Sequence, residues 1–405
     1  MIPASDIHDS PYSWLRLAIT LAVATIGNVG MWAVVVVLPA IQEEFGGSRA
    51  DASLPYMTAM FGFAIGSYVV GRLVDRYGIT LALIASAMVI SVGFALSAVA
   101  PSLFVISVIH FAIGFGGATC FGPLIADISH WFMRRRGIAV AVAASGNYIS
   151  GAFWPLVLSG LIADGAWRTA YLVLAVAALA IMVPLALLLR RQVPQEAHAA
   201  ATAQSTARMA TTGLPPNVLM WLLALAGIGC CMAMAMPQVH IVALCVDFGF
   251  GPAVGAEMLS LMLVGGVASR LIFGLLADQL GGVRTLLIGS VLQCIALFLY
   301  LPAGGIVSLY IVSLVFGLSQ GGIVPSYAVI VREYMPPKEA GARVGLVMMA
   351  TILGMAFGGW ASGWIYDLTG SYRWAFLNGI AWNFLNIAIV GMLFVRARPG
   401  RLAAA

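Results

Sequence analysis

Charge is scarce in this chain of 405 residues. Charged side chains make up 9% of the sequence and hydrophobic ones 62%, and the mean hydropathy is +1.01. Soluble globular domains carry about 25% charged residues, so this composition excludes a soluble protein of this length and indicates one embedded in a lipid bilayer. The single lysine, Lys338, is followed by Glu339, which excludes a phosphate-binding loop ending in Gly-Lys-Ser/Thr.

Cysteine is also scarce, and its spacing fits neither disulfides nor a metal site. The five cysteines are Cys120, Cys230, Cys231, Cys245 and Cys294. An odd number inside apolar segments argues against a disulfide framework and a zinc site, so we expect no metal and no cofactor. The formal net charge of +5 is not gathered into one exposed basic stripe, and we therefore expect no nucleic-acid partner.

Long apolar windows recur twelve times along the chain. A helix needs about 20 apolar residues to span a hydrocarbon core of about 30 Å. Such windows lie at 14–38, 52–71, 79–99, 102–126, 137–162, 169–189, 216–246, 254–276, 283–302, 306–331, 342–365 and 374–395. The sequence therefore predicts an all-α membrane protein with twelve transmembrane helices.

The basic residues predict the orientation in the membrane. With both termini in the cytoplasm, only Arg49, Arg168 and Arg373 lie outside, Arg270 lies within the membrane, and the other sixteen of the 20 lysines and arginines lie inside. This asymmetry satisfies the positive-inside rule. The polar residues 1–13 lack the pattern of a cleaved signal peptide. We expect a multi-pass protein of a bacterial-type inner membrane with cytoplasmic termini.

An internal repeat at an offset of 203 residues divides the chain. The segment Gly71-Arg-Leu-Val-Asp-Arg-Tyr-Gly78 matches Gly274-Leu-Leu-Ala-Asp-Gln-Leu-Gly281. The other pairs at this offset are Gly114 with Gly317 and Asp164 with Asp367. Such a repeat predicts two pseudo-symmetric six-helix halves related by an axis along the membrane normal. We place the halves at 1–190 and 217–405, joined by a polar cytoplasmic linker at 191–216.

The motif at Gly71–Gly78 and its copy resemble the loop motif of the major facilitator superfamily, and the resemblance covers nearly the whole chain. In that family the motif aspartate pairs with cations of neighbouring cytoplasmic helices and holds the two halves shut on the inner side. The residues that we expect to form such a gate are Asp75, Arg76, Asp127, Arg134, Asp278, Arg332 and Glu333. The alternative is that these are solvated loop charges that only fix the topology.

Arg270 is a full positive charge inside an apolar window. A guanidinium is not deprotonated in proteins, and near the bilayer centre it costs at least about 2.5 to 3.5 kcal/mol. One interpretation is that it snorkels to the cytoplasmic surface; the other is that it binds a substrate carboxylate. Its place four residues before Gly274 resembles the monocarboxylate porters and the oxalate–formate exchanger, in which this arginine binds the substrate carboxylate.

Two departures from those families narrow the expected substrate. The animal monocarboxylate porters carry an aspartate implicated in proton coupling one turn before the arginine, where this chain has Gly266. The oxalate exchanger holds its dianion with an additional lysine of helix 11, whereas Lys338 of this chain falls in a predicted loop. One buried cation favours a monocarboxylate over a dicarboxylate.

Two histidines are candidates for proton coupling. His110 lies where many superfamily members have an arginine associated with proton transfer in symporters, and imidazole titrates in the physiological range. His240 lies near the outer end of the seventh predicted helix and close to Glu257, with which it could form an outer latch. For each histidine the alternative is a neutral side chain bonded inside the helix bundle.

Polar and aromatic residues at mid-membrane depth complete the candidate substrate site. Buried amides and phenols need a partner, which a ligand, a cavity water or a neighbouring helix supplies. The candidates are Asn28, Trp32, Asn147, Tyr148, Gln238 and Tyr327. Tyr327 has the strongest case, because related porters use a tyrosine of this helix beside the arginine.

The sequence favours a secondary transporter, not an enzyme, that moves a small organic monocarboxylate with a proton by alternating access as a functional monomer. An organic-anion exchanger is one alternative, and proton-coupled efflux is another. Exporters of this superfamily usually show a Gly-rich stretch ending in Gly-Pro in the fifth helix, a pattern absent between Ala144 and Pro155. A membrane sensor or embedded enzyme would need a signalling domain or a catalytic cluster, and the sequence reveals neither.

Overall fold

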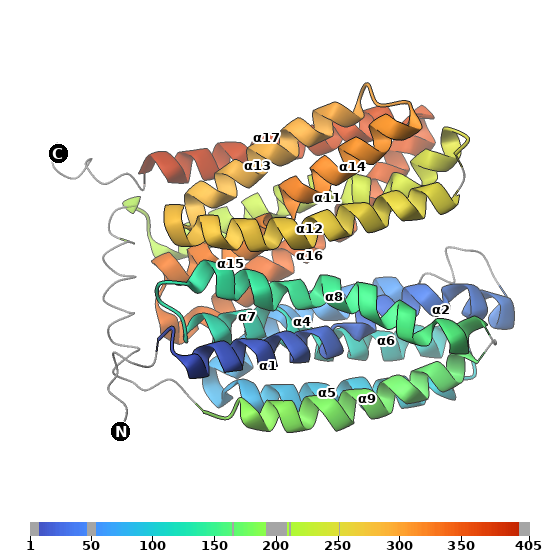
Figure 1. Cartoon of the computed structure of the whole chain (residues 1–405), viewed down its shortest axis with the longest axis horizontal. Helices are drawn as coiled ribbons and strands as arrows, with labels where there is room; N and C mark the ends of the chain where they lie inside the picture. The colour runs from blue at the N-terminus through green and yellow to red at the C-terminus, as the bar shows by residue number, and fades with distance from the viewer. Residues whose placement is uncertain are drawn as a thin grey trace. The chain divides into compact units, whose positions relative to one another are not determined.

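A computed structural model describes residues 8–46, 54–163, 166–191, 209, 212–250 and 252–396, and every regular element in these ranges is a helix (Figure 1). Most of the predicted linker at 191–216 lies outside these residues, as do Arg49 and Asp164. Eleven helical stretches of the described chain are long and apolar enough to span a membrane, and a 28-residue helix, α8, covers the fifth predicted window. The predicted all-α fold with twelve transmembrane helices is confirmed.

The helix boundaries follow the predicted windows closely. The first half contains α1 (Pro11–Gly27), α2 (Val29–Phe45), α4 (Leu54–Tyr77), α5 (Ile79–Ala98), α6 (Leu103–Gly117), η2 (Ala118–Cys120), α7 (Gly122–Ser129), α8 (Arg136–Ala163) and α9 (Trp167–Leu188). The second half contains α11 (Pro216–Asp247), α12 (Pro252–Leu280), α13 (Gly282–Tyr300), α14 (Ile306–Gln320), α15 (Ile323–Tyr334), η3 (Pro337–Glu339), α16 (Ala340–Thr369) and α17 (Tyr372–Arg396).

Three predicted windows, 14–38, 102–126 and 306–331, each contain two α-helices instead of one. At the first break, Nδ2 of Asn28 donates to the Ala24 carbonyl at 2.7 Å, a local bond that competes with the helical ladder. Gly122 and Pro123 begin α7, and two glycines separate α14 from α15. Glycine and proline weaken helix interiors, but an apolar window does not reveal such breaks.

The chain groups into two compact units. Unit 1 comprises Met1–Met133, Val142–Ala199 and Pro337–Met349, and unit 2 comprises Arg134–Ala141, Ala200–Pro336 and Ala350–Ala405. Helices α8 and α16 therefore each begin in one unit and continue in the other. The boundaries 1–190, 191–216 and 217–405 stay a prediction.

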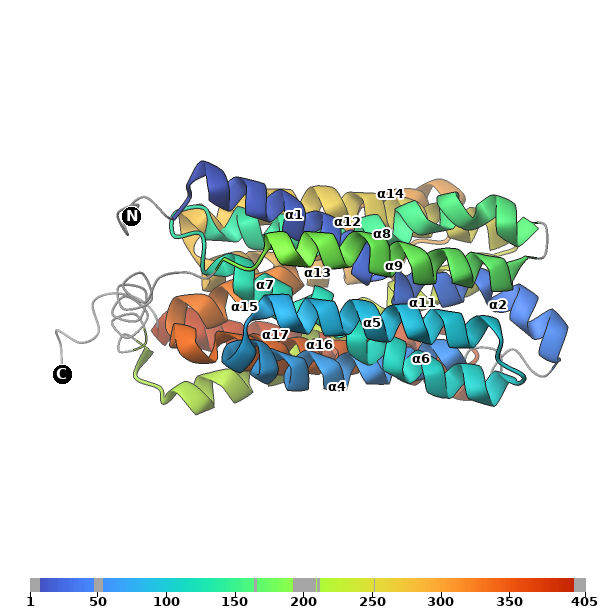
Figure 2. The ribbon, with the colours of Figure 1, turned by 90° about the horizontal axis from the view of Figure 1, so that it is seen from below.

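Within unit 1, α5 lies beside α9 and α4 lies beside α6 (Figures 1 and 2). The contact of α4 with α6, which we call the α4–α6 seam, brings backbone against backbone. A Cβ atom on Gly114 would lie 1.9 Å from the Ala59 carbonyl oxygen, and one on Gly62 would lie 2.0 Å from that of Phe111. Only glycine permits so close an approach at these positions.

Unit 2 repeats this packing between α12 and α14, the α12–α14 seam. A Cβ atom on Gly317 would lie 2.2 Å from the carbonyl oxygen of Met262. Gly317 and Met262 follow Gly114 and Ala59 by the same 203 residues. The motif glycines Gly78 and Gly281 also match, since each has a φ of 82°, a left-handed conformation that favours glycine. The repeat seen in the sequence therefore recurs as matched backbone packing.

Candidate functional site

Arg270 is enclosed within unit 2, where its side chain is 3% exposed. Its Nε donates to the carbonyl of Gly321 at 3.1 Å. Gly321 directly follows α14, and the last carbonyls of a helix lack intrahelical partners and carry a partial negative charge. The break between α14 and α15 thus provides an acceptor for the guanidinium.

Tyr327 lies in a buried polar network of unit 2. Its hydroxyl donates to Oδ1 of Asn386 at 2.9 Å. Nδ2 of Asn386 in turn donates to Oγ of Ser290 at 2.7 Å, and Nδ2 of Asn383 donates to the Ser290 carbonyl at 2.9 Å. Sequence reasoning missed these three partners, although two asparagines three residues apart in an apolar helix share one face. Tyr327 is therefore held by α13 and α17.

His240 and Gln238 lie near the end of α11. Nε2 of His240 donates to the carbonyl of Gly359 at 2.8 Å, which places its proton on Nε2 because a carbonyl only accepts. Nδ1 then accepts from the Tyr372 hydroxyl at 3.3 Å. Glu257 accepts a hydrogen bond from Tyr310, and none joins it to His240. Within the described part of the chain, the buried Nε2 of Gln238 has no hydrogen-bond partner.

In unit 1 the structure brings two of the predicted site residues together. Nε1 of Trp32, in α2, donates to the backbone oxygen of Asn147 at 3.0 Å and to its Oδ1 at 2.9 Å. Tyr148, the next residue of α8, is half-buried. Asn28 is buried, and besides Ala24 its Nδ2 reaches the Cys120 carbonyl at 3.2 Å.

His110 is fully buried inside unit 1. Its Nδ1 lies 2.9 Å from the Ile106 carbonyl oxygen and its Nε2 lies 3.1 Å from the Tyr171 hydroxyl. The carbonyl can only accept, so the neutral ring carries its proton on Nδ1 and accepts the Tyr171 hydroxyl hydrogen at Nε2. Both nitrogens are therefore bonded to neighbours on α6 and α9.

The two motif aspartates each bind the first turn of a helix. In unit 1, Asp75 accepts from the backbone N–H groups of Gly341 and Ala342, both at 2.8 Å. In unit 2, Asp278 accepts from the N–H groups at the start of α8, including that of Ile138 at 3.1 Å. A carboxylate at a helix N-terminus satisfies donors that lack intrahelical partners and complements the helix dipole.

Asp127 pairs with a cation that sequence reasoning overlooked. Nη2 of Arg16 lies 2.7 Å from its Oδ2, and the two side chains are 1% and 18% exposed. Nη1 of Arg16 donates to the carbonyls of Leu189 and Arg191, and its guanidinium lies 4.6 Å from the ring centre of Trp131. The signal was an arginine inside the first predicted span. Arg16 thus fastens the end of α9 to Asp127.

The remaining predicted gate residues differ in their surroundings. Arg76 and Arg134 are exposed, and Arg76 lies over the ring of Tyr77. Arg332 is 3% exposed, and its carbonyl accepts from Arg136 at 3.4 Å. Oε2 of Glu333 accepts from the N–H of Gly282, at the start of α13, at 3.0 Å.

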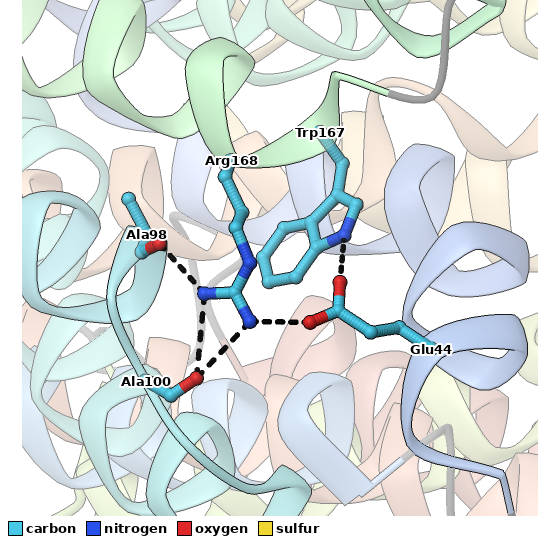
Figure 3. Close-up of polar contacts among 5 residues, drawn as sticks. All are labelled: Glu44, Ala98, Ala100, Trp167 and Arg168. Atoms are coloured by element: carbon cyan, nitrogen blue, oxygen red, sulfur yellow. Dashed lines mark hydrogen bonds and ion pairs between the residues drawn. The ribbon is translucent and has the colours of Figure 1, made fainter.

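Arg168 gathers three segments of unit 1 around the start of α9 (Figure 3). Its Nη1 donates to the Ala98 carbonyl at 2.7 Å, and its Nη2 donates to Oε1 of Glu44. Nε1 of Trp167 donates to the other carboxylate oxygen at 2.8 Å. The hydrogen bond from Arg168 is the main reason why the pKa of Glu44 lies below its usual value of 4.5. This cluster ties the end of α2 to α9 and the end of α5.

Comparisons with known proteins give consistent matches. The sequence profile of the Major Facilitator Superfamily matches residues 20–254 and 221–404. The chain is 28% identical over 384 residues to monocarboxylate transporter 11 of Homo sapiens, covering 91% of this chain and 80% of that one. It is 27% identical over 333 residues to monocarboxylate transporter 13 of Bos taurus, covering 80% and 75%. The solved fucose:proton symporter of E. coli superposes with a TM-score of 0.70 at 15% identity, covering 94% of this chain and 99% of that one.

The matches agree with the features already described. The profile spans nearly the whole chain, and the helical fold superposes on the solved symporter over 94% of this chain. Such proteins sit in a membrane and carry small molecules across it. The chain is therefore a multi-pass membrane transporter, not an enzyme, and it belongs to the Major Facilitator Superfamily.

Proposed function

We propose that this transporter moves a small organic monocarboxylate together with a proton, by alternating access, across a bacterial-type inner membrane. We further propose that it works as a monomer with both termini in the cytoplasm. The observation that carries the proposal is Arg270, a guanidinium that is 3% exposed within a membrane-spanning helix. The names of two relatives, both monocarboxylate transporters, support the substrate class.

The donors of the Arg270 guanidinium suit a single carboxylate that is bound through the two Nη groups. Its Nε donates to the Gly321 carbonyl, and we propose its two terminal Nη groups as the donors to the substrate carboxylate. That end-on approach still allows two parallel charge-assisted hydrogen bonds.

For the proton we propose His110, with His240 as the second candidate. His110 already carries one proton on Nδ1, and its Nε2 accepts from the Tyr171 hydroxyl at 3.1 Å. When Nε2 takes up a second proton, the Tyr171 hydroxyl must turn its hydrogen away and accept instead. The solved neighbour that couples fucose to protons supports proton symport as a mode of this fold.

For the inner gate we propose the seven charged residues named from the sequence, led by Asp75 and Asp278. The hydrogen bonds of Asp75 and Asp278 to the first turns of α16 and α8 support this role, because each of these helices begins in one unit and continues in the other. A carboxylate that leaves such a turn exposes several unpaired N–H groups, so these contacts favour one conformation over others.

Uptake by proteoliposomes tests the substrate claim. With an inward proton gradient, the wild-type protein should accumulate labelled short monocarboxylates, and Arg270→Lys should abolish uptake because a lysine lacks the planar fork. Arg284→Lys, which changes an exposed arginine of the same unit, is the matched control and should transport normally. Undiminished uptake by a folded Arg270→Lys protein would refute the role of Arg270.

The same vesicles separate the alternatives. Uptake that needs an anion inside the vesicle but no pH gradient indicates exchange, and expulsion of apolar cations instead of acids indicates efflux. His110→Gln should lose gradient-driven accumulation while retaining downhill movement. Full accumulation by His110→Gln contradicts its role as the proton carrier.

A further inference from the structure

The Arg16 guanidinium has one buried donor that no residue of the described chain accepts. Nη1 donates to the carbonyls of Leu189 and Arg191 at 3.0 and 3.1 Å, and Nη2 donates to Oδ2 of Asp127 at 2.7 Å. Nε is buried and, within the described ranges, has no hydrogen-bond partner. The whole side chain is buried, so bulk water does not reach this nitrogen. A buried N–H group without an acceptor is unfavourable.

Thr20 carries a second buried polar atom of this kind, one turn further along α1. The side chain is fully buried, and among the residues that the structure describes none forms a hydrogen bond with its Oγ1. A threonine in a helix can donate to the carbonyl four residues earlier, as Thr25 of the same helix does to Leu21 at 2.9 Å. Thr20 does not make the corresponding bond to the Arg16 carbonyl, so its hydroxyl is directed away from its own backbone.

The spacing of Arg16 and Thr20 suits one small ligand shared by both side chains. Residues four apart on a helix are neighbours on one face, with Cβ atoms about 5 to 6 Å apart. The Thr20 side chain leans toward the N-terminus of its helix and therefore toward Arg16. A single atom that is hydrogen-bonded to both groups holds them at most about 6 Å apart.

The surrounding charges indicate a neutral ligand. The ligand must accept a hydrogen bond from Nε of Arg16, because that nitrogen only donates. Asp127 already supplies the counter-charge of the guanidinium, so a buried anion here would lack a cation of its own. A cation would face the Nε hydrogen. Water is a small neutral molecule that accepts and donates, and buried waters in proteins bond polar groups that are otherwise unsatisfied.

We propose that unit 1 binds a structural water molecule between Nε of Arg16 and Oγ1 of Thr20. Its oxygen accepts from Nε and from the Thr20 hydroxyl, and its own hydrogens can be donated to the second lone pairs of neighbouring carbonyls. The water thus completes the contact by which Arg16 joins α1 to Asp127 of α7 and to the end of α9. This inference is independent of the proposed transport function.

Thermal unfolding of the whole protein in detergent tests the proposal. Thr20→Val keeps the shape of the side chain but removes the hydroxyl, so it should lower the midpoint by about 2 to 4 °C as the water loses a partner. Thr25→Val is the matched control, because the Thr25 hydroxyl donates to its own helix, and it should leave the midpoint nearly unchanged. A midpoint that rises or stays the same in Thr20→Val overturns the proposal, since removing a hydroxyl that is truly unpaired does not destabilise a protein.

An experimental structure at a resolution that shows ordered water tests the site directly. The wild type should have a density peak within about 3.2 Å of both atoms, Thr20→Ser should keep it, and Thr20→Val should lose it. A protein atom in that place overturns the proposal. Stabilisation of the wild type, but not of Thr20→Val, by chloride relative to gluconate assigns an anion to the site and also overturns it. The uptake experiments on Arg270 are unaffected by any of these results.

Discussion

Adding one methyl group at Gly321 should weaken substrate binding beyond any loss of protein stability that the same change causes. A Cβ atom there would lie 2.1 Å from the carbonyl oxygen of Gly266, and ordinary contacts begin at 3.4 Å. In Gly321→Ala the start of the α14–α15 break must therefore shift by about 1 Å. The hydrogen bond from Arg270 to the Gly321 carbonyl is 3.1 Å long, and such a shift takes it past the limit of a hydrogen bond.

The magnitude of the effect follows from the charge on the donor. Hydrogen bonds to charged groups contribute about 1.5 to 3 kcal/mol, and 1.4 kcal/mol corresponds to a factor of ten. If Gly321 orients Arg270 for a carboxylate, Gly321→Ala should raise the KM for the transported monocarboxylate roughly 10- to 100-fold.

Gly317→Ala is the control for this experiment. The Cβ atom that this substitution adds would lie 2.2 Å from the Met262 carbonyl oxygen. The substitution therefore disturbs the same α12–α14 seam one turn earlier, but it does not directly move the Gly321 carbonyl that accepts from Arg270. Thermal unfolding in detergent should show similar losses of stability for both variants, and uptake kinetics should show the rise in KM for Gly321→Ala. An equal rise in both variants, or none in Gly321→Ala, would refute the reasoning.

Two further predictions concern unit 1. Arg16→Met should lower the free energy of unfolding by about 3 to 5 kcal/mol, as expected when one partner of a buried ion pair is removed, because Asp127 loses its cation. Thermal unfolding checks this against Arg72→Met, which removes an exposed arginine, and equal losses contradict it. The pKa of Glu44 is lowered by Arg168, so the pair should stabilise the cluster above about pH 4.5 and lose this effect as the pH falls through the lowered pKa. The protection factors of the amides near Ala98 and Ala100, which correct for the pH dependence of intrinsic exchange, should then fall in the wild type and be low at every pH in Glu44→Gln; wild-type protection factors that do not change with pH would be the contrary result.

The architecture of this protein could be predicted from the sequence because the bilayer imposes a length on every spanning helix. The twelve windows depend on hydropathy and the 203-residue repeat on matched glycines and aspartates, and both are read directly along the chain. Gly78 and Gly281 illustrate this, since glycines matched in the sequence share a φ of 82°. Arg270 also stood out in the sequence as a charge inside an apolar window, but its hydrogen bond to the Gly321 carbonyl did not.

The partners of the buried polar groups could not be predicted in the same way. A helix that is apolar on every side gives no periodic signal of which face meets another helix. Asn383 and Asn386 therefore gave no indication that they would meet Ser290 and Tyr327. Arg16 was visible in the sequence, but its partner Asp127 lies 111 residues away. The contact of Trp32 with Asn147 likewise depends on how α2 and α8 pack.

The two glycine seams have a consequence for biosynthesis. Each joins helices that are separated by one intervening helix, α4 with α6 and α12 with α14. During translation, α4 is therefore complete before α6, its partner in the seam, has been synthesised. The stretch from Tyr77 to Gly117 takes roughly 2 to 8 s to synthesise at about 5 to 20 residues per second. During that interval the glycine surface of α4 has only lipid or translocation machinery against it, so bulky substitutions along the seams should first appear as poor insertion yield in cells.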